Sequence, residues 1–189
     1  MVIIARKRLI IMKTPFLFIF AIFTLITSCS SDDSNNSDDE NDTNLNKTVC
    51  ENGFADEYPC SGYDLLLNLD LEFFNASAAN DSWGWTDTTT NSEYALLGLD
   101  NGTAFIDITD TENPVYLGKL ATATENSDWR DIKVYNNHAF IVSEAQDHGM
   151  QVFDLTRLRD INNIPQDYTA DAHFTDFGSA HNIVINEDS

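Results

Sequence analysis

Basic residues are scarce in this chain. Its 189 residues include ten lysines and arginines against 31 aspartates and glutamates, which gives a formal net charge of −21 at pH 7. Proteins that bind nucleic acid or anionic headgroups through charge need clustered basic side chains to contact phosphate. The acidic excess therefore argues against nucleic acid as a partner, and it is compatible with basic partners or divalent cations.

The chain also lacks the short motifs of several common enzyme classes. It contains no Walker loop, no dinucleotide-binding glycine fingerprint, no nucleophile elbow and no zinc-protease motif. No cofactor is predicted, with calcium kept as an alternative. An enzyme whose catalytic residues come from separate repeats is still compatible with these absences.

Three cysteines are present, and the first has an informative setting. An apolar run over 15–26 follows Lys13, and two small residues lead from it into Cys29. This is the pattern of a lipoprotein signal peptide, 1–28, ending in a lipobox whose cysteine carries the lipid. The run is shorter than the about 20 residues of a spanning helix, which favours a signal peptide over the alternative, an uncleaved membrane anchor.

The segment 29–49 is predicted to be a disordered acidic tether, because it is almost entirely polar up to Asn46 and cannot bury apolar surface. Removing the signal peptide takes away four basic residues and no acidic ones, which leaves six against 31 and a net charge of −25. The Ser-Asp-Asp cluster at 31–33 resembles the export signal of surface-exposed lipoproteins in some Gram-negative lineages; a periplasmic spacer is the alternative. We therefore expect an outer-membrane lipoprotein at the cell surface, attached to the membrane by its lipid.

Cys50 and Cys60 remain as an even pair in an oxidising compartment. A disulfide between them closes the loop 51–59 and stabilises the fold by about 2–3 kcal/mol on the chain-entropy model. A two-cysteine metal site is the alternative, but no histidine lies nearby to complete it. We place both cysteines in a disulfide-bearing N-terminal segment, 50–79, in which 64–71 forms a helical turn or a packed loop.

From residue 80 onward the sequence predicts an all-β domain, 80–189. Short β-rich runs alternate with Gly, Asn, Asp and Pro. The expected strands are 94–99, 103–108, 115–120, 131–135, 139–143, 150–155, 168–173 and 182–185. The run 102–109 corresponds to 149–156, which gives a period of about 45–50 residues, typical of β-propeller blades of about four strands.

The stretch 102–118 (GTAFIDITDTENPVYLG) resembles an LVIVD repeat. The wider chain is similar to the choice-of-anchor B family of exported proteins, which share this domain and differ in how they attach. The matching segments are 50–60 with 64–66, 80–85, 129–134, 148–155 and 180–183. The resemblance implies a propeller and an anchored surface location, and it implies no known reaction.

The chain stops at Ser189, soon after a third repeat begins. A closed propeller has about four to eight blades, whereas two blades and a fragment are expected here. We therefore expect a chain that is truncated relative to this family, with strand edges and apolar blade faces left open.

Polar residues open each expected innermost strand, and the innermost strands of a propeller line its central channel. The candidate ligand site at one mouth of that channel consists of Asp81, Ser82, Arg130, Asp131, His181 and Asn182. Carboxylate, guanidinium and imidazole groups in a concavity are suited to binding a cation, an anionic sugar or an ester. The alternative is that a wet channel mouth simply favours polar side chains.

Two other sets of polar residues are interpreted as structural and not as parts of a ligand site. Asp107 and Asp154 recur at the same place in two repeats, which indicates carboxylates that accept backbone N–H groups where a strand meets a turn. Glu144, Asp147 and His148 match no metal-binding motif and indicate an exposed polar loop; the alternative is that they bind calcium or zinc.

The leading functional hypothesis is a surface-anchored, non-catalytic module that binds an extracellular protein or glycan. Trp83, Trp85 and Trp129 are candidates for stacking on sugars, although aromatic residues at blade junctions are more often core. The alternative is a propeller hydrolase or lyase at the channel mouth. Its site would consist of Asp81, Arg130, Asp131 and His181.

Overall fold

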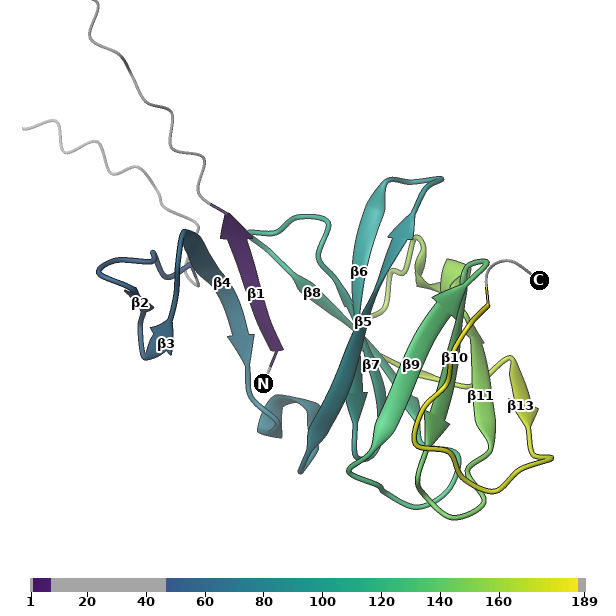
Figure 1. The fold of residues 1–189 in the computed structure, drawn as a ribbon. Coiled ribbons are helices and arrows are strands. Elements are labelled where there is room, and N and C mark those ends of the chain that lie inside the picture. The colour runs from purple at the N-terminus through teal and green to yellow at the C-terminus, as the bar shows by residue number, and fades with distance from the viewer. Residues whose placement is uncertain (1, 8–46, 187–189) are drawn as a thin grey trace, which may run out of the picture.

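The computed structural model describes residues 2–7 and 47–186, in which the regular secondary structure is almost entirely β-strand (Figure 1). The strands are β1 (Val2–Lys7), β2 (Phe54–Ala55), β3 (Tyr58–Pro59), β4 (Tyr63–Leu69), β5 (Ala79–Asp87), β6 (Ser92–Leu99), β7 (Gly102–Asp107), β8 (Val115–Ala121), β9 (Arg130–Tyr135), β10 (His138–Ser143), β11 (Met150–Asp154), β12 (Gln166–Tyr168) and β13 (Ala172–Phe174). The short 3-10 helices η1 (Glu72–Phe74) and η2 (Leu155–Leu158) interrupt them. The predicted all-β class is confirmed.

Two larger sheets form the body of the described chain. One has the strand order β12-β8-β7-β6-β5 and the other the order β13-β11-β10-β9. Strands β5 to β8 follow one another as antiparallel neighbours, and so do β9 to β11. Strand β12 instead crosses back from the second sheet and adds to β8 in parallel. Gly118 permits this close approach, because a Cβ atom there would lie 2.0 Å from the Gln166 carbonyl oxygen.

The main hydrophobic core lies between these two sheets. Phe105 of β7 and Phe153 of β11 are fully buried and stack with ring centroids 4.6 Å apart. Tyr168 of β12 packs edge-on against both rings, at 5.5 and 5.2 Å. Aromatic side chains bury large apolar areas. The two repeats therefore share one core and form one packed unit.

The other face of the β5–β8 sheet is covered by the segment between β4 and β5. Helix η1 buries Phe74 to 2% exposure, in a cluster with Leu99 and Ile106. The Phe74 ring also meets Tyr116 edge-on, with centroids 5.3 Å apart. Apolar side chains are thus buried on both faces of this sheet, whereas Trp83 of its edge strand β5 is 41% exposed.

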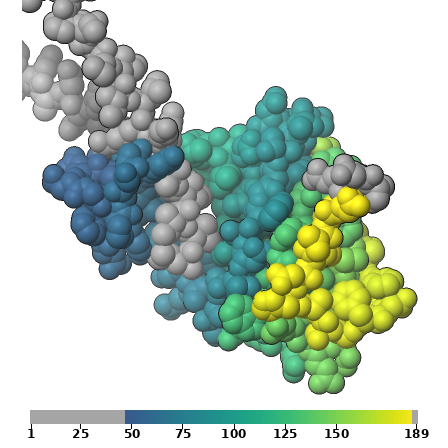
Figure 2. All heavy atoms as spheres, viewed as in Figure 1, coloured from purple at the N-terminus to yellow at the C-terminus, as the bar shows by residue number. Residues whose placement is uncertain are grey.

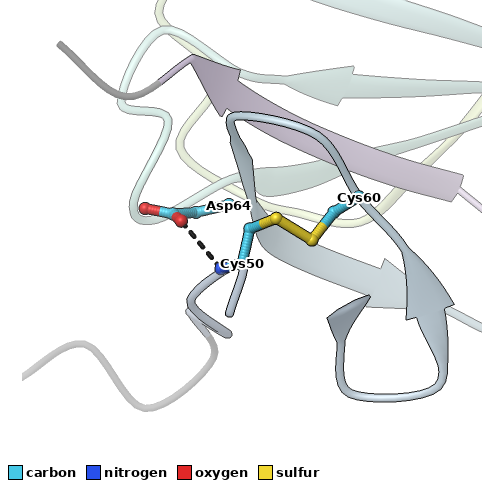
Figure 3. The surroundings of a disulfide bond; sticks show 3 residues. All are labelled: Cys50, Cys60 and Asp64. Carbon is cyan, nitrogen blue, oxygen red and sulfur yellow. Dashed lines mark hydrogen bonds between the residues drawn. A yellow bond between two sulfur atoms is a disulfide. The ribbon is translucent and has the colours of Figure 1, made fainter. Parts of the chain in front are cut away.

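The predicted disulfide between Cys50 and Cys60 is confirmed (Figure 3). It closes a loop that contains the β2–β3 hairpin. The Asp64 carboxylate accepts a hydrogen bond from the Cys50 backbone N–H at 2.9 Å, and Lys47 Nζ lies 3.7 Å from its other oxygen. This contact fixes the disulfide loop to the beginning of β4.

Most predicted strands form with small shifts at their ends, namely those at 94–99, 103–108, 115–120, 131–135, 139–143 and 150–155. The prediction of one strand at 168–173 is wrong in detail. Its two halves join different sheets, β12 adding to β8 and β13 to β11.

Two predictions of local structure are wrong. The segment 64–71 is neither a helical turn nor a loop, because most of it belongs to β4, which buries Leu65 and Leu66. The segment 182–185 is not a strand, although its β-branched sequence favours one. It lacks the sheet neighbour that a strand requires for its backbone hydrogen bonds.

No helix within the described ranges is long and apolar enough to cross a membrane. The apolar core of the predicted signal peptide, Cys29 and nearly all of the predicted tether lie outside those ranges. The part of the predicted signal peptide that is described, β1, pairs antiparallel with β4 (Figure 1).

Candidate functional site

A similar hydrogen bond joins β5 to β9 and β9 to the segment 182–185. Asp81 Oδ2 accepts the backbone N–H of Ile132 at 2.8 Å, and Asp131 Oδ2 accepts the backbone N–H of Ile183 at 2.7 Å. The two bonds span 51 and 52 residues of sequence. They align Asp81 with Asp131. Pairing the polar dipeptides Asp81-Ser82 and Arg130-Asp131 by sequence would instead align Asp131 with Ser82. Ser82 is exposed one position further along β5.

Lys133 joins the two aspartates. Its Nζ lies 2.6 Å from Asp131 Oδ1 and 3.9 Å from Asp81 Oδ2, and it sits 4.5 Å above the centre of the Trp83 ring. Burial raises the pKa of Asp81 more than the Ile132 hydrogen bond lowers it. Burial acts on Asp131 in the same direction, but hydrogen bonds from Lys133 and Ile183 outweigh it and lower that pKa. The two pKa values therefore move in opposite directions, and the interaction between the two carboxyl groups contributes to both shifts, raising the pKa of Asp81 and lowering that of Asp131.

Arg130 is buried, which corrects the solvent-facing position predicted for it in the ligand site. The residue is 1% exposed and lies between the two sheets. Its Nε donates to the Leu99 carbonyl oxygen at 2.9 Å, and its Nη2 donates to Thr122 Oγ1 at 3.0 Å. Its Nη1 lies 3.0 Å from His148 Nε2. Burial lowers the pKa of Arg130 to about 10, so the guanidinium stays protonated at neutral pH.

His148 is buried against the Arg130 guanidinium, so the prediction that it lies in an exposed loop is wrong. Its Nε2 must accept from Arg130, so its proton lies on Nδ1, which donates to the Gly149 carbonyl oxygen at 3.0 Å. Burial lowers the pKa of His148, and the positive charge of Arg130 acts in the same direction. The imidazole is therefore a neutral acceptor for the guanidinium.

Exposed polar and aromatic groups gather instead around Trp129, Glu144 and His181, which we call the Trp129 rim. Trp129 is 50% exposed. The His181 ring lies beside it with centroids 5.8 Å apart, and His181 Nδ1 is 2.5 Å from Glu144 Oε1. The side chains of His181 and Glu144 are 58% and 43% exposed. An indole face, a carboxylate and an imidazole are thus presented together to solvent.

Ser143, the buried last residue of β10, holds the Trp129 rim together. Its hydroxyl donates to the Trp129 carbonyl oxygen at 3.1 Å, and the Glu144 N–H donates to the same oxygen at 3.2 Å. The Ser143 carbonyl oxygen accepts from the N–H of Ala180, which precedes His181. Three segments that are distant in sequence are therefore fixed to one another through backbone groups.

A groove of about 410 Å³ lies next to the Trp129 rim. Its lining is mostly apolar, and it includes Val142, Met150 and Phe177 together with Asn182 of the predicted site. Asn182 is exposed, whereas Asp131 is 5% exposed and has its carboxylate engaged. Of the six predicted residues, His181 and Asn182 are thus the ones that face solvent beside a concavity.

The structural roles predicted for Asp107 and Asp154 are confirmed. Asp107 Oδ1 accepts the Thr109 N–H at 2.8 Å, and Asp154 Oδ1 accepts the Thr156 N–H at 2.9 Å. Both carboxylates cap the turn that follows a strand. Neither belongs to the Trp129 rim.

Within residues 2–7 and 47–186, no group of three or more His, Cys, Asp or Glu side chains is arranged to hold a metal ion. Glu144, Asp147 and His148 do not converge, because His148 is buried against Arg130 while the other two are exposed. The calcium hypothesis therefore has no donor cluster in this part of the chain.

Comparisons of the chain with family models, with curated proteins and with solved structures find no match. The interpretation of function therefore depends on the geometry described above and on the sequence signals.

Proposed function

We propose that this protein is a surface-anchored lipoprotein whose β-domain binds an extracellular glycan or protein at the Trp129 rim. The exposed indole of Trp129, held beside His181 and Glu144, is the observation that carries the proposal. An apolar ring face bordered by hydrogen-bonding groups suits a sugar ring, which has an apolar face and a hydroxyl edge. Because the predicted mature chain has a net charge of −25, a neutral glycan or a basic protein suits the site better than a polyanion.

We further propose that the two larger sheets are blades of a propeller of the LVIVD and choice-of-anchor B type. The supporting feature is the repeated bond from Asp81 to Ile132 and from Asp131 to Ile183. The same donor–acceptor pair at nearly equal sequence spacing is expected when blades repeat around an axis. The matching hairpin order of β5–β8 and β9–β11 also supports it.

A hydrolase or lyase at the channel mouth has less support. Two of its four expected residues, Arg130 and Asp131, are 1% and 5% exposed and are engaged by backbone and side-chain partners. A catalytic group must come within hydrogen-bond reach of its substrate. A binding site that uses exposed side chains agrees better with the geometry.

Replacing Trp129 by alanine should weaken ligand binding while leaving the fold intact, because the indole face is lost and a half-exposed side chain contributes little to the core. The probe is a panel of neutral oligosaccharides, with binding measured by calorimetry and by tryptophan fluorescence. We expect the affinity to fall about tenfold or more, in line with the loss of an aromatic anchor.

The matched variants are Trp129→Phe, which keeps an aromatic face, and Phe54→Ala, which removes another exposed aromatic residue (53% exposed) from the β2 strand. Trp129→Phe should retain part of the affinity, and Phe54→Ala should retain all of it. Equal binding by the wild type and Trp129→Ala would refute the rim as the glycan site.

Replacing Cys29 by serine should prevent lipid attachment, because the thiol is the group that is acylated. In cells fed a radiolabelled fatty acid, the wild type should incorporate label and Cys29→Ser should not. The Cys50→Ser/Cys60→Ser double variant is the control and should remain labelled. Label on the Cys29→Ser protein would contradict the lipoprotein assignment.

A further inference from the structure

We infer that a cavity at one end of the main hydrophobic core binds a small aliphatic amine, and that the Asp107 carboxylate receives its ammonium group. The cavity has a volume of about 340 Å³ and lies between strands β6 to β8 on one side and the segment 158–164 on the other. Small-molecule sites have volumes of about 300–1,000 Å³. The inference goes beyond the proposed function and does not depend on it, because the described residues that line this cavity are not those of the Trp129 rim.

This cavity, which we call the Asp107 cavity, is at the opposite end of the β5–β8 sheet from the Trp129 rim. Arg130 follows Trp129 directly, and its N–H donates to Asn80 Oδ1, at the start of β5, at 3.2 Å. Because β6 is antiparallel to β5, the first residues of β6, which line the cavity, lie at the other end of the sheet. Figure 2 shows the tip of the β5–β6 hairpin, in teal, projecting from the body at this end. The Asp107 cavity is therefore a separate site.

One wall of the Asp107 cavity carries three different groups in a row across the sheet. Asp107 of β7 is paired with Tyr94 of β6 and with Val115 of β8. Directly paired residues of antiparallel strands project from the same face of the sheet. A phenol, a carboxylate and an aliphatic side chain therefore lie side by side, and all three line the cavity.

The opposite wall, the segment 158–164, is fixed to the same sheet at both ends. Arg159 Nε and Nη2 lie 2.5 and 2.9 Å from the two carboxylate oxygens of Asp87, which is 1% exposed. After this segment, β12 pairs with β8 and places Gln166 opposite Gly118. The cavity is therefore formed before a ligand arrives, which lowers the entropic cost of binding.

The charges around the Asp107 cavity favour a cation. Among the described residues that line it, Arg159 is the only basic one, and its guanidinium is neutralised by Asp87. The lining also contains the carboxylates of Asp107 and Asp160. Asp107 caps its turn through Oδ1, which accepts the Thr109 N–H at 2.8 Å, so Oδ2 is a second acceptor that can face a ligand. The cavity therefore attracts a positively charged group and repels an anion.

The rest of the lining is suited to an alkyl chain. Val115 and Ile164 lie on opposite walls and are 38% and 44% exposed. Exposed apolar residues gathered around a concavity mark ligand sites. In the described part of the chain no three metal-binding side chains converge, whereas an ammonium group needs only a carboxylate and a further acceptor such as the Tyr94 hydroxyl. The cation that fits is therefore an organic amine with an aliphatic body.

The ligand class is tested with three compounds of the same chain length, hexylammonium, hexanol and hexanoate, added to the full-length protein at neutral pH. Hexylammonium should bind, with amide chemical-shift changes concentrated at 92–94, 107, 115 and 158–161. Hexanol should bind about tenfold more weakly or less, because it lacks the charge-assisted hydrogen bond, and hexanoate should not bind. No binding of hexylammonium, or equal or tighter binding of hexanol, would overturn the amine site.

The role of Asp107 is tested by Asp107→Asn, which keeps an oxygen to cap Thr109 but removes the negative charge. The affinity for hexylammonium should fall about tenfold or more. Asp154→Asn is the matched control, because Asp154 caps Thr156 in the same way and does not line the cavity; it should bind as tightly as the wild type. Urea unfolding of both variants separates a loss of stability from a loss of binding. Equal affinities of Asp107→Asn and Asp154→Asn would overturn Asp107 as the receiving group.

The position of the alkyl chain is tested by Val115→Thr, which keeps the shape of the side chain and replaces one methyl group by a hydroxyl. The affinity for hexylammonium should fall about threefold or more, because an apolar contact is lost. Val49→Thr makes the same change at a valine of equal exposure, 38%, that does not line the cavity, and it should have no effect. Wild-type affinity in Val115→Thr would contradict an alkyl chain packed against this wall.

Discussion

Replacing Arg130 by alanine is expected to lower the free energy of unfolding by about 3–5 kcal/mol, the range for breaking a buried charge network. The guanidinium donates to the Leu99 carbonyl, to Thr122 and to His148 in a region that is closed to water. Its removal leaves these acceptors without a donor and opens a cavity between the sheets. The measurement is urea unfolding of the processed chain, 29–189 carrying Cys29→Ser, followed by tryptophan fluorescence.

Arg157→Ala is the matched control for this loss. Arg157 pairs with Asp171 at 3.0 Å, but its side chain is 35% exposed, so its ion pair is screened by solvent. We expect a cost of about 1 kcal/mol or less. If Arg130→Ala and Arg157→Ala destabilised the protein equally, Arg130 would not be the buried tie between the sheets.

The second large effect is expected for Phe105→Ala, which should destabilise the protein by about 3–5 kcal/mol. Phe105 is fully buried and touches both Phe153 and Tyr168, so three elements lose a shared contact. Fluorescence and far-ultraviolet circular dichroism should report one common unfolding transition, because both sheets depend on this core.

Phe105→Leu keeps an apolar side chain at the same position and should cost about 1 kcal/mol. Phe174→Ala removes an aromatic ring that is 47% exposed and should change stability by about 0.5 kcal/mol or less. Two separate transitions in the wild type would contradict the shared core.

Much of the fold could be predicted from the sequence, because strands and turn caps depend on residues that are close together in the chain. Short β-rich runs between Gly, Asn, Asp and Pro predicted eight strands from residue 80 onward, and six of them form. The recurrence of Asp107 and Asp154 at the same place in two repeats predicted two turn caps. The placement of 64–71 failed because its leucine-rich run fits a helical turn as well as a strand. The strand at 182–185 failed because strand formation needs a neighbouring strand, which a local pattern does not report.

The candidate site was less predictable because it depends on which side of a strand each residue faces. Arg130 shares its face of β9 with Ile132 and Val134, so the alternation itself indicated an inward side chain. It was assigned to the ligand site instead because Arg130 and Asp131 form a polar pair at the start of the expected strand. Ser143 gave no signal, because its role depends on contacts with Trp129 and Ala180.

Strand β12 has a consequence for the order in which the molecule assembles. Its pairing of Gln166 with Gly118 means that the first sheet is completed by residues that follow most of the second. A chain that emerges from its N-terminus therefore cannot complete the first sheet before most of the second has arrived. Such late, long-range closure is slow, and the β8 edge stays unpaired until β12 reaches it.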